Sequence, residues 1–240
     1  MTENAAYIVL SRQMAIRRQM DTIANNIANM NTTSFKTQRI LFEEFLMDTD
    51  DGGKMAYVRD FGSVRDLQQG ELRSTLNPLD IAIDGPGYFR VETADGERYT
   101  RNGHFRSDAE GFLVTPGGDK LLNERGTVIR LDPADPQFNV SRDGTVSNSQ
   151  GPLGKLAVVT FENEQNMIPV GGGLYKTDDP AEPAEDVRLV QGMIESSNVE
   201  PIMEMTRMIQ ASRAYESTRS MMKKDDDVRQ QAISRLGRVE

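Results

Sequence analysis

The sequence of 240 residues contains no cysteine and no tryptophan, and its only histidine is His104. A chain without cysteine forms neither a disulfide framework nor a thiolate metal site, and one histidine cannot hold zinc by itself. No serine-nucleophile motif and no distinctive acid–base pair of carboxylates stands out. We therefore expect no enzymatic activity, no cofactor, no metal site and no small-molecule substrate.

Long apolar runs are missing as well. No segment approaches the ~20 apolar residues that a membrane-spanning helix needs. Arg12, Arg17 and Arg18 interrupt the N-terminal stretch, so it lacks the continuous apolar core of a secretory signal peptide. We expect no direct membrane insertion, and any export from the cytoplasm would proceed without a Sec signal.

Basic residues are scarce in the middle of the chain. Residues 41–190 carry 15 basic and 27 acidic side chains, whereas residues 1–40 carry 5 and 2, and residues 191–240 carry 8 of each. An acidic middle argues against nucleic acid and anionic membrane surfaces as partners. The two ends have no such excess of one charge, so they can pack together without strong repulsion.

Residues 1–35 predict a helix with a narrow apolar stripe. Apolar side chains recur every seven residues, with two more between them, at Val9, Ile16, Met20, Ile23, Ile27 and Met30. Alternating steps of 4 and 3 are typical of a coiled-coil seam. An ordinary amphipathic helix that packs on its own domain would show much of the same pattern, so both interpretations stay open.

Three asparagines accompany this stripe: Asn25, Asn26 and Asn29. Asparagine is a poor helix former because its side chain competes for backbone hydrogen bonds. Three of them in five residues therefore predict specific hydrogen bonds to another helix or another subunit.

Residues 195–240 predict a second heptad helix. Pro201 suits its first turn. Its apolar rows contain Met205, Met208, Tyr215, Met222, Ile233 and Leu236. Both ends of the chain thus predict helices that pair.

Residues 78–194 predict a central, mostly antiparallel β domain. Asp95-Gly96, Asn102-Gly103 and Asp143-Gly144 are hairpin dipeptides that would separate short strands. The expected strands cover residues 79–83, 88–91, 112–114, 127–131, 137–140, 155–161 and 187–190. Residues 36–77 are predicted as a connecting arm or loop, within which residues 41–47 could continue as a short helix. The predicted fold class is α+β, with discontinuous N- and C-terminal helices forming a coiled-coil-like domain.

Three motifs in order resemble the family of flagellar rod and hook proteins. They are ANNIANMNTTSFK at residues 24–36, NPLDIAIDGPGYFRV at residues 77–91 and SSNVEPIMEMTRMIQASRAYES at residues 196–217. The length and the run SRQMAIRRQM at residues 11–20 favour the proximal-rod branch of this family over the distal-rod branch.

The resemblance implies a structural role. The terminal helices would pair in an inner tube, the β domain would lie outside, and subunits would stack helically into the rod that transmits motor torque. It implies as partners further copies of the chain, neighbouring rod proteins and the flagellar type III export apparatus, with the rod lying in the periplasm. The predicted assembly interface comprises Val9, Ile16, Met20, Ile23, Asn25, Asn26, Ile27, Asn29, Met30, Met205, Met208, Ser212, Arg213, Tyr215, Met222, Ile233 and Leu236.

Ser34 departs from the family pattern, which usually has glycine before the Phe-Lys pair. Serine with a positive φ costs roughly 1 kcal/mol or more. Either the turn differs here, or the strain is offset in the assembly.

Three other functions compete with the rod subunit. A soluble adaptor would combine a helical hairpin with a β ligand domain and would form a discrete dimer at all concentrations. An enzyme acting on peptidoglycan would need a cleft with a matched acid and base. A phage-tail or pilus-like polymer is physically similar but would lack these motifs.

Overall fold

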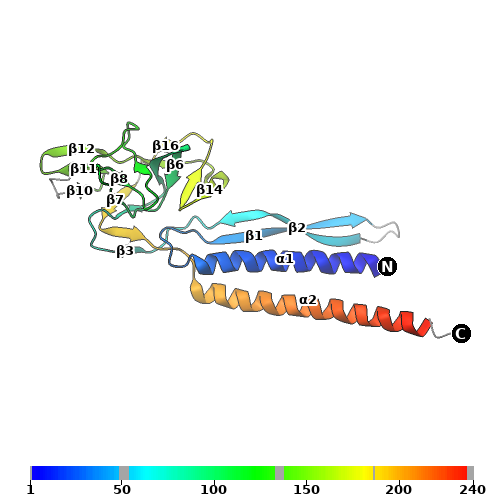
Figure 1. The fold of residues 1–240 in the computed structure, drawn as a ribbon. Coiled ribbons are helices and arrows are strands. Elements are labelled where there is room, and N and C mark those ends of the chain that lie inside the picture. Colours follow the sequence, from blue (N-terminus) through cyan, green and yellow to red (C-terminus); the bar gives the residue numbers. More distant parts are fainter. Residues whose placement is uncertain (1, 49–53, 133–137, 186, 237–240) are drawn as a thin grey trace. The chain divides into compact units, whose positions relative to one another are not determined.

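The computed structural model describes residues 2–48, 54–132, 138–185 and 187–236, and for residues 2–8, 43–48, 54–61, 229, 232 and 236 it describes the backbone alone. The chain divides into two units (Figure 1). The helical unit comprises Met1–Met30, Thr37–Asp66 and Val199–Glu240. The β unit comprises Asn31–Lys36 and Leu67–Asn198. None of the described helices combines the length and the apolar character that crossing a membrane requires.

The helical unit contains two long helices and one hairpin. Helix α1 spans Thr2–Ala28 and helix α2 spans Pro201–Leu236. Strands β1 (Gln38–Asp48) and β2 (Lys54–Arg65) form an antiparallel ladder from Gln38↔Arg65 to Asp48↔Lys54. Figure 1 shows α1 lying between this hairpin and α2.

The hairpin corrects the expectation of a short helix at residues 41–47, which all belong to β1. Aromatic and branched residues such as Phe42 and Ile40 suit a strand better than a helix, because helical packing restricts their χ1 rotamers. The partner strand β2 then provides cross-strand neighbours along the whole length, for example Tyr57 opposite Phe45. Strand pairing therefore outweighs the weak helical pattern.

The β unit is built from short strands, and every pairing of its described residues is antiparallel. The largest sheet of the described residues has nine strands, and smaller sheets pair β10-β11-β12, β17-β4 and β18-β3. The strands are β3 (Leu72–Ser74), β4 (Ile81–Asp84), β5 (Tyr88–Thr93), β6 (Gly96–Thr100), β7 (Arg106–Ser107), β8 (Leu113–Val114), β9 (Lys120–Leu121), β10 (Asn139–Val140), β11 (Thr145–Asn148), β12 (Gly151–Lys155), β13 (Val158–Thr160), β14 (Ile168–Gly171), β15 (Leu174–Lys176), β16 (Glu182–Pro183), β17 (Arg188–Gln191) and β18 (Met193–Glu195), with a 3-10 turn at Glu164–Asn166.

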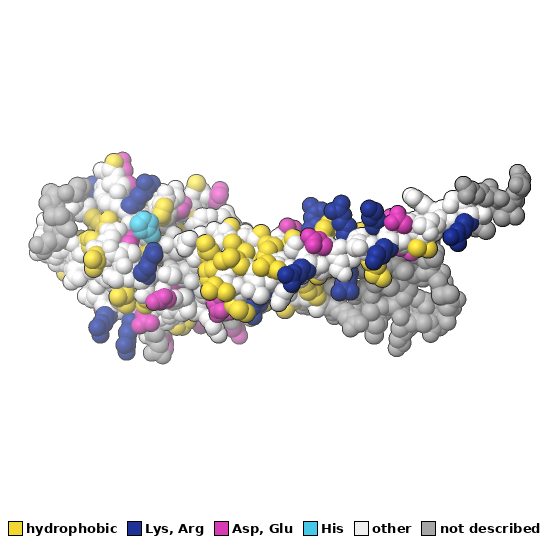
Figure 2. Space-filling model, turned by 90° about the horizontal axis from the view of Figure 1, so that it is seen from below, with side chains coloured by type: hydrophobic (Ala, Val, Ile, Leu, Met, Phe, Trp, Pro, Cys, Tyr) yellow, Lys and Arg dark blue, Asp and Glu magenta, His cyan; other side chains and the backbone are white. Residues whose placement is uncertain are grey.

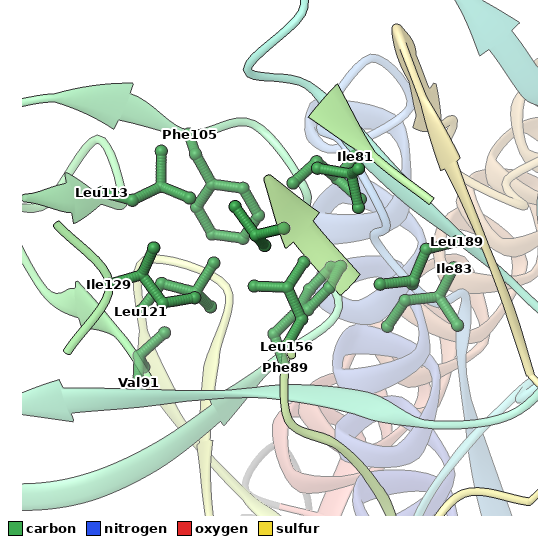
Figure 3. Packing of buried hydrophobic residues seen from close by; sticks show 12 residues of the cluster. Ile81, Ile83, Phe89, Val91, Phe105, Leu113, Leu121, Ile129, Leu156 and Leu189 are labelled. Carbon is green, nitrogen blue, oxygen red and sulfur yellow. The ribbon is translucent and has the colours of Figure 1, made fainter. Parts of the chain in front are cut away.

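A single apolar cluster forms the core of this unit (Figure 3). It takes alternate side chains from several strands, among them Ile81, Phe89 and Leu121, which are fully buried. The rings of Phe89 and Phe105 meet edge to face at 5.2 Å and 82°. Alternation along β5 places Phe89 and Val91 inward, as period-2 patterning requires.

The α+β class and the β-rich middle are confirmed, and most expected strands overlap observed ones. The segment 127–131 is the exception, because it contributes only isolated bridges at Val128 and Arg130. Strand β6 escaped prediction because its residues, GERYT, are largely polar. It forms by pairing with β5 across the Asp95-Gly96 turn.

Gly103 does not form the hairpin turn that its Asn-Gly dipeptide predicts. Its backbone lies against β4: the Ile81 N–H donates to the Gly103 carbonyl at 2.9 Å. A Cβ at position 103 would lie 1.7 Å from the Ile81 carbonyl oxygen. Glycine is needed here for close backbone approach and not for a turn.

We expect Gly103→Ala to lower the free energy of unfolding of the β unit by about 1–3 kcal/mol, because the backbone must move to admit the methyl group. Gly117→Ala is the matched control, since its Cβ would meet only the flexible Asp119 side chain, at 3.1 Å. Urea denaturation of both variants measures the difference. Equal stability of the two variants would contradict the close approach.

A second aromatic cluster surrounds Tyr99, whose ring packs edge to face on Phe161 at 4.7 Å. Its hydroxyl donates to Glu97 at 2.9 Å, and Glu97 also accepts two hydrogen bonds from Arg90. Burial, helped by the bond to Glu97, raises the pKa of Tyr99 to about 12. The hydrogen bonds from Arg90 lower the pKa of Glu97.

The raised pKa of Tyr99 predicts a loss of stability in strong base. The neutral phenol is favoured in the folded state, so its contribution is complete below the usual tyrosine pKa of ~10 and disappears as the pH rises through about 12. The difference in near-ultraviolet absorbance between the natural chain and Tyr99→Phe, recorded against pH, isolates this group. A midpoint near the usual value would contradict its burial.

Candidate assembly interface

Helices α1 and α2 pack through the stripe that the heptad pattern predicts. Ile16, Ile23 and Ala211 are buried at the centre of this seam. Five partly buried side chains complete the cluster: Met20, Ile27, Met208, Ala214 and Tyr215. The apolar stripes of the two chain ends thus meet within one molecule.

The remaining residues of the predicted interface have varied exposure. Four are half-buried: Val9, Asn29, Ser212 and Met222. Five are exposed: Asn25, Met30, Met205, Arg213 and Ile233. The side chain of Leu236 lies outside the described residues.

Asn26 is the one asparagine of the three that is buried, with 1% of its surface exposed. Its amide nitrogen donates to the Gln38 carbonyl at 2.9 Å and to Oε2 of Glu204 at 3.1 Å. Its amide oxygen accepts from the Gln38 N–H at 3.0 Å. One side chain therefore ties α1 to the start of β1 and to the first turns of α2.

The other two asparagines have different environments. The Asn29 side chain donates to the carbonyl of Asn25, at 2.9 Å, within its own helix end. Asn25 is exposed. The expectation that all three asparagines meet neighbouring subunits is narrowed, because Asn26 bonds inside its own unit.

Glu204 is a functional residue that pattern reasoning missed. It is buried, and it accepts from both Asn26 and Arg207. An acidic residue in the first turn also interacts favourably with the helix dipole. A carboxylate between Met203 and Met205 on an otherwise apolar stretch was the available signal, since a charge there requires a partner.

In the β unit, Ser34 occupies the strained turn that glycine would allow freely. Its φ is 57°, so the turn does not differ from the expected left-handed one. Its hydroxyl donates to the Arg101 carbonyl at 2.8 Å, and its N–H donates to the Glu195 carbonyl at 2.9 Å. These bonds, each worth about 0.5–1.5 kcal/mol net, offset the strain inside the chain without help from an assembly.

Next to this turn lies a buried group of charges centred on Glu195. Its carboxylate accepts from Lys36 at 2.7 Å, from the Gly70 N–H at 2.9 Å and from Arg101. Lys36 also donates to the Gln68 carbonyl at 2.7 Å. Residues distant in sequence meet here, where the chain passes from the first helix into the β unit and out again toward the second.

Burial has opposite consequences for the two sides of this group. Desolvation lowers the pKa of Lys36, and the attraction of Glu195 only partly opposes it. Arg101 spreads its remaining donors over the Gly87 and Gly85 carbonyls, at 2.9 and 2.6 Å. All charges are therefore bonded, as buried charges must be.

An apolar face of α2 remains uncovered. Ile202, Met205 and Ile209, spaced by 3 and 4, are 78%, 49% and 54% exposed. Figure 2 shows hydrophobic side chains gathered over the first turns of this helix. A contiguous exposed apolar patch is typical of an interaction surface.

Three family models match the chain. They are described as a flagella basal body rod protein over residues 7–36, the flagellar hook protein FlgE/F/G D1 domain over residues 82–148, and the flagellar basal body rod FlgEFG protein C-terminal over residues 190–235. The chain belongs to the family of flagellar basal-body rod and hook proteins.

Within this family the chain is similar to rod proteins along its whole length. It is 37% identical to the flagellar basal-body rod protein FlgF of Caulobacter vibrioides, over 99% of both chains. It is 34% identical to FlgF of Mesorhizobium japonicum, over 98% of both. It is 33% identical to the rod protein FlgG of Bacillus subtilis, over 95% of this chain and 97% of that protein.

Proposed function

We propose that this chain is a structural subunit of the bacterial flagellar basal-body rod and that its helical unit forms the contacts between subunits. The observation that carries the proposal is the uncovered apolar face of α2, formed by Ile202, Met205 and Ile209, on a helix already paired through its other face. The full-length similarity to rod proteins supports the same role.

Assembly through this face follows from the hydrophobic effect. Each large apolar side chain removed from water contributes on the order of 1.5–3 kcal/mol. A face of α2 that meets a different surface on the next copy makes a head-to-tail contact, which continues into a filament and does not close as a dimer. The α1–α2 seam would act in this polymer as a coiled-coil-like pair.

The predicted interface residues divide into two groups in this proposal. Buried and half-buried members, such as Ile16 and Tyr215, pair the two helices of one chain. Exposed members, such as Asn25, Met205 and Ile233, are free to meet a neighbouring subunit. Methionines on such a face can adapt to slightly different neighbours around a tube.

The finer assignment is a proximal-rod subunit of the FlgF type, with a distal-rod subunit of the FlgG type as the alternative. Greater identity to two FlgF proteins favours the first, and the near-complete match to FlgG keeps the second. The proposed partners are further copies of the chain, neighbouring rod proteins and the flagellar type III export apparatus. The proposed location is the periplasmic part of the rod, and the proposed role involves no catalysis.

Deletion of the gene tests the role. We expect cells without motility and without complete basal bodies in electron micrographs, and restoration of both by the natural sequence. A tag on the chain, located in purified basal bodies, distinguishes a position at the proximal rod from one at the distal rod. Normal basal bodies in the deletion strain would contradict the proposal and favour the soluble adaptor.

A further inference from the structure

Leu76 is an unusual leucine in the turn between β3 and β4. Its φ is 61°, in the left-handed region that side chains with a Cβ rarely occupy, and 89% of its surface is exposed. The first property costs roughly 1–2 kcal/mol relative to an ordinary backbone conformation. The second keeps an apolar side chain in water. Neither stabilises the isolated unit, so the side chain must earn its place in a contact outside it.

The turn that carries Leu76 is firmly anchored. The N–H groups of Thr75 and Leu76 both donate to the Gly192 carbonyl, at 2.8 and 3.2 Å. The Asn77 side chain donates to Asp80 at 3.0 Å and accepts from the Leu79 N–H at 3.2 Å. Leu76 is therefore held in place as a fixed apolar projection, which reduces the entropy cost of docking it.

The same unit contains a pocket of about 670 Å³ that could receive such a projection. Its walls are largely aliphatic and come from β13, β16 and the segments beside them. The apolar lining includes Leu156, Ala157, Val158, Pro183, Ala184 and Val187. A leucine side chain would be removed from water on most sides there.

The charges beside the two features are opposite. Within four positions of Leu76, Asp80 is buried and bonded to His104, and Arg73 is exposed. At the pocket, Lys155 and Arg90 are paired with Glu124 and Glu97, at 2.8 and 2.7 Å. The other charged residues of its lining are acidic.

These remaining acidic residues are Asp143 and Glu185, both exposed. A copy that presents Leu76 would bring Arg73 toward them. Such complementary charge favours this partner and orients it.

We propose that Leu76 of one copy of this chain inserts into the pocket beside Ala184 of a second copy. The contact joins two different surfaces of the β unit, so it is head-to-tail and continues along a polymer, as the rod role requires. It rests on the proposed function for the reason that copies adjoin, and it adds a β-unit contact to the one assigned to the helices.

The absence of natural cysteine allows a direct test on the purified full chain. Leu76→Cys and Ala184→Cys chains are mixed and oxidised, and the mixed disulfide dimer is quantified. The control mixture replaces Leu76→Cys with Leu153→Cys, another exposed leucine of the same unit. We expect about tenfold more mixed dimer from the first mixture, because docking raises the effective concentration of the two thiols.

Equal yields from the two mixtures would overturn the proposal, as would a dominant dimer between two Leu76→Cys chains. Oxidative trapping collects transient encounters, so this result does not depend on stable filaments. Failure of the rod role is distinguished because it appears separately, as normal basal bodies in the deletion strain.

A second variant separates docking from folding. Leu76→Asn removes the apolar projection but keeps a residue that tolerates the left-handed conformation. We expect its melting temperature to equal or exceed that of the natural chain, while the pocket cross-link formed by a cysteine at Arg73 falls to the control level. A clearly lower melting temperature would show that Leu76 stabilises its own unit and would overturn the proposal.

Discussion

Glu195→Gln lowers the free energy of unfolding of the β unit by about 3–5 kcal/mol, the cost of leaving buried charges without their partner. Glu195 is 1% exposed and faces two cations, Lys36 and Arg101, which are 5% and 7% exposed. Glutamine keeps the shape but removes the charge that holds both. Hydrogen exchange of the β-unit amides in urea measures the change.

The exposed pair Lys155–Glu124 provides the matched control. Its side chains are 46% and 52% exposed at a similar N–O distance of 2.8 Å. Glu124→Gln should therefore cost only ~0–1 kcal/mol, because water screens the pair. Similar losses in the two variants would mean that the group around Glu195 is accessible to solvent.

Asn26→Ala lowers the free energy of unfolding of the helical unit by about 2–4 kcal/mol, because buried polar groups lose their partners. The N–H and carbonyl of Gln38 and the carboxylate of Glu204 all bond to this one amide. Circular dichroism in urea follows the unit directly, since both long helices belong to it.

Asn25→Ala is the control one position away. Asn25 is exposed, so its replacement should change stability by no more than ~0.5 kcal/mol. Equal effects at the two positions would indicate that the amide of Asn26 does not hold α1 to β1 and α2.

Local patterns predicted the helices well. Ile16, Ile23 and Met208 recur at heptad spacing, and this periodicity is a property of each segment by itself. Hairpin β1–β2 was missed because a strand needs a partner, and nothing near residue 40 identifies residues 54–65 as that partner.

The buried polar groups lay beyond the reach of pattern reasoning. Lys36 and Arg101 are 159 and 94 positions from Glu195, and only the folded chain brings them together. Asn26 was identified as a residue with a specific partner, but the partner, Glu204, is 178 positions away. Sequence indicates that such a side chain needs a bond, whereas the fold decides which one it makes.

The Ser34 turn shows the same division. Its departure from the family glycine was visible in the sequence, and the expected strain is present at φ 57°. What offsets the strain, the Arg101 and Glu195 carbonyls, was not visible, because both residues come from the far side of the β unit in sequence.

Sedimentation of the Ile209→Asp chain against concentration tests most directly whether the helical unit drives assembly. Ile209 is 54% exposed, so the charge should leave the helical circular dichroism unchanged. We expect the concentration needed for assembly to rise about tenfold or more, since each ~1.4 kcal/mol lost from a contact is tenfold in affinity. Gln210→Asp, at the exposed neighbouring position, should change it little. Assembly of the Ile209→Asp chain at the same concentration as the natural chain would contradict the account.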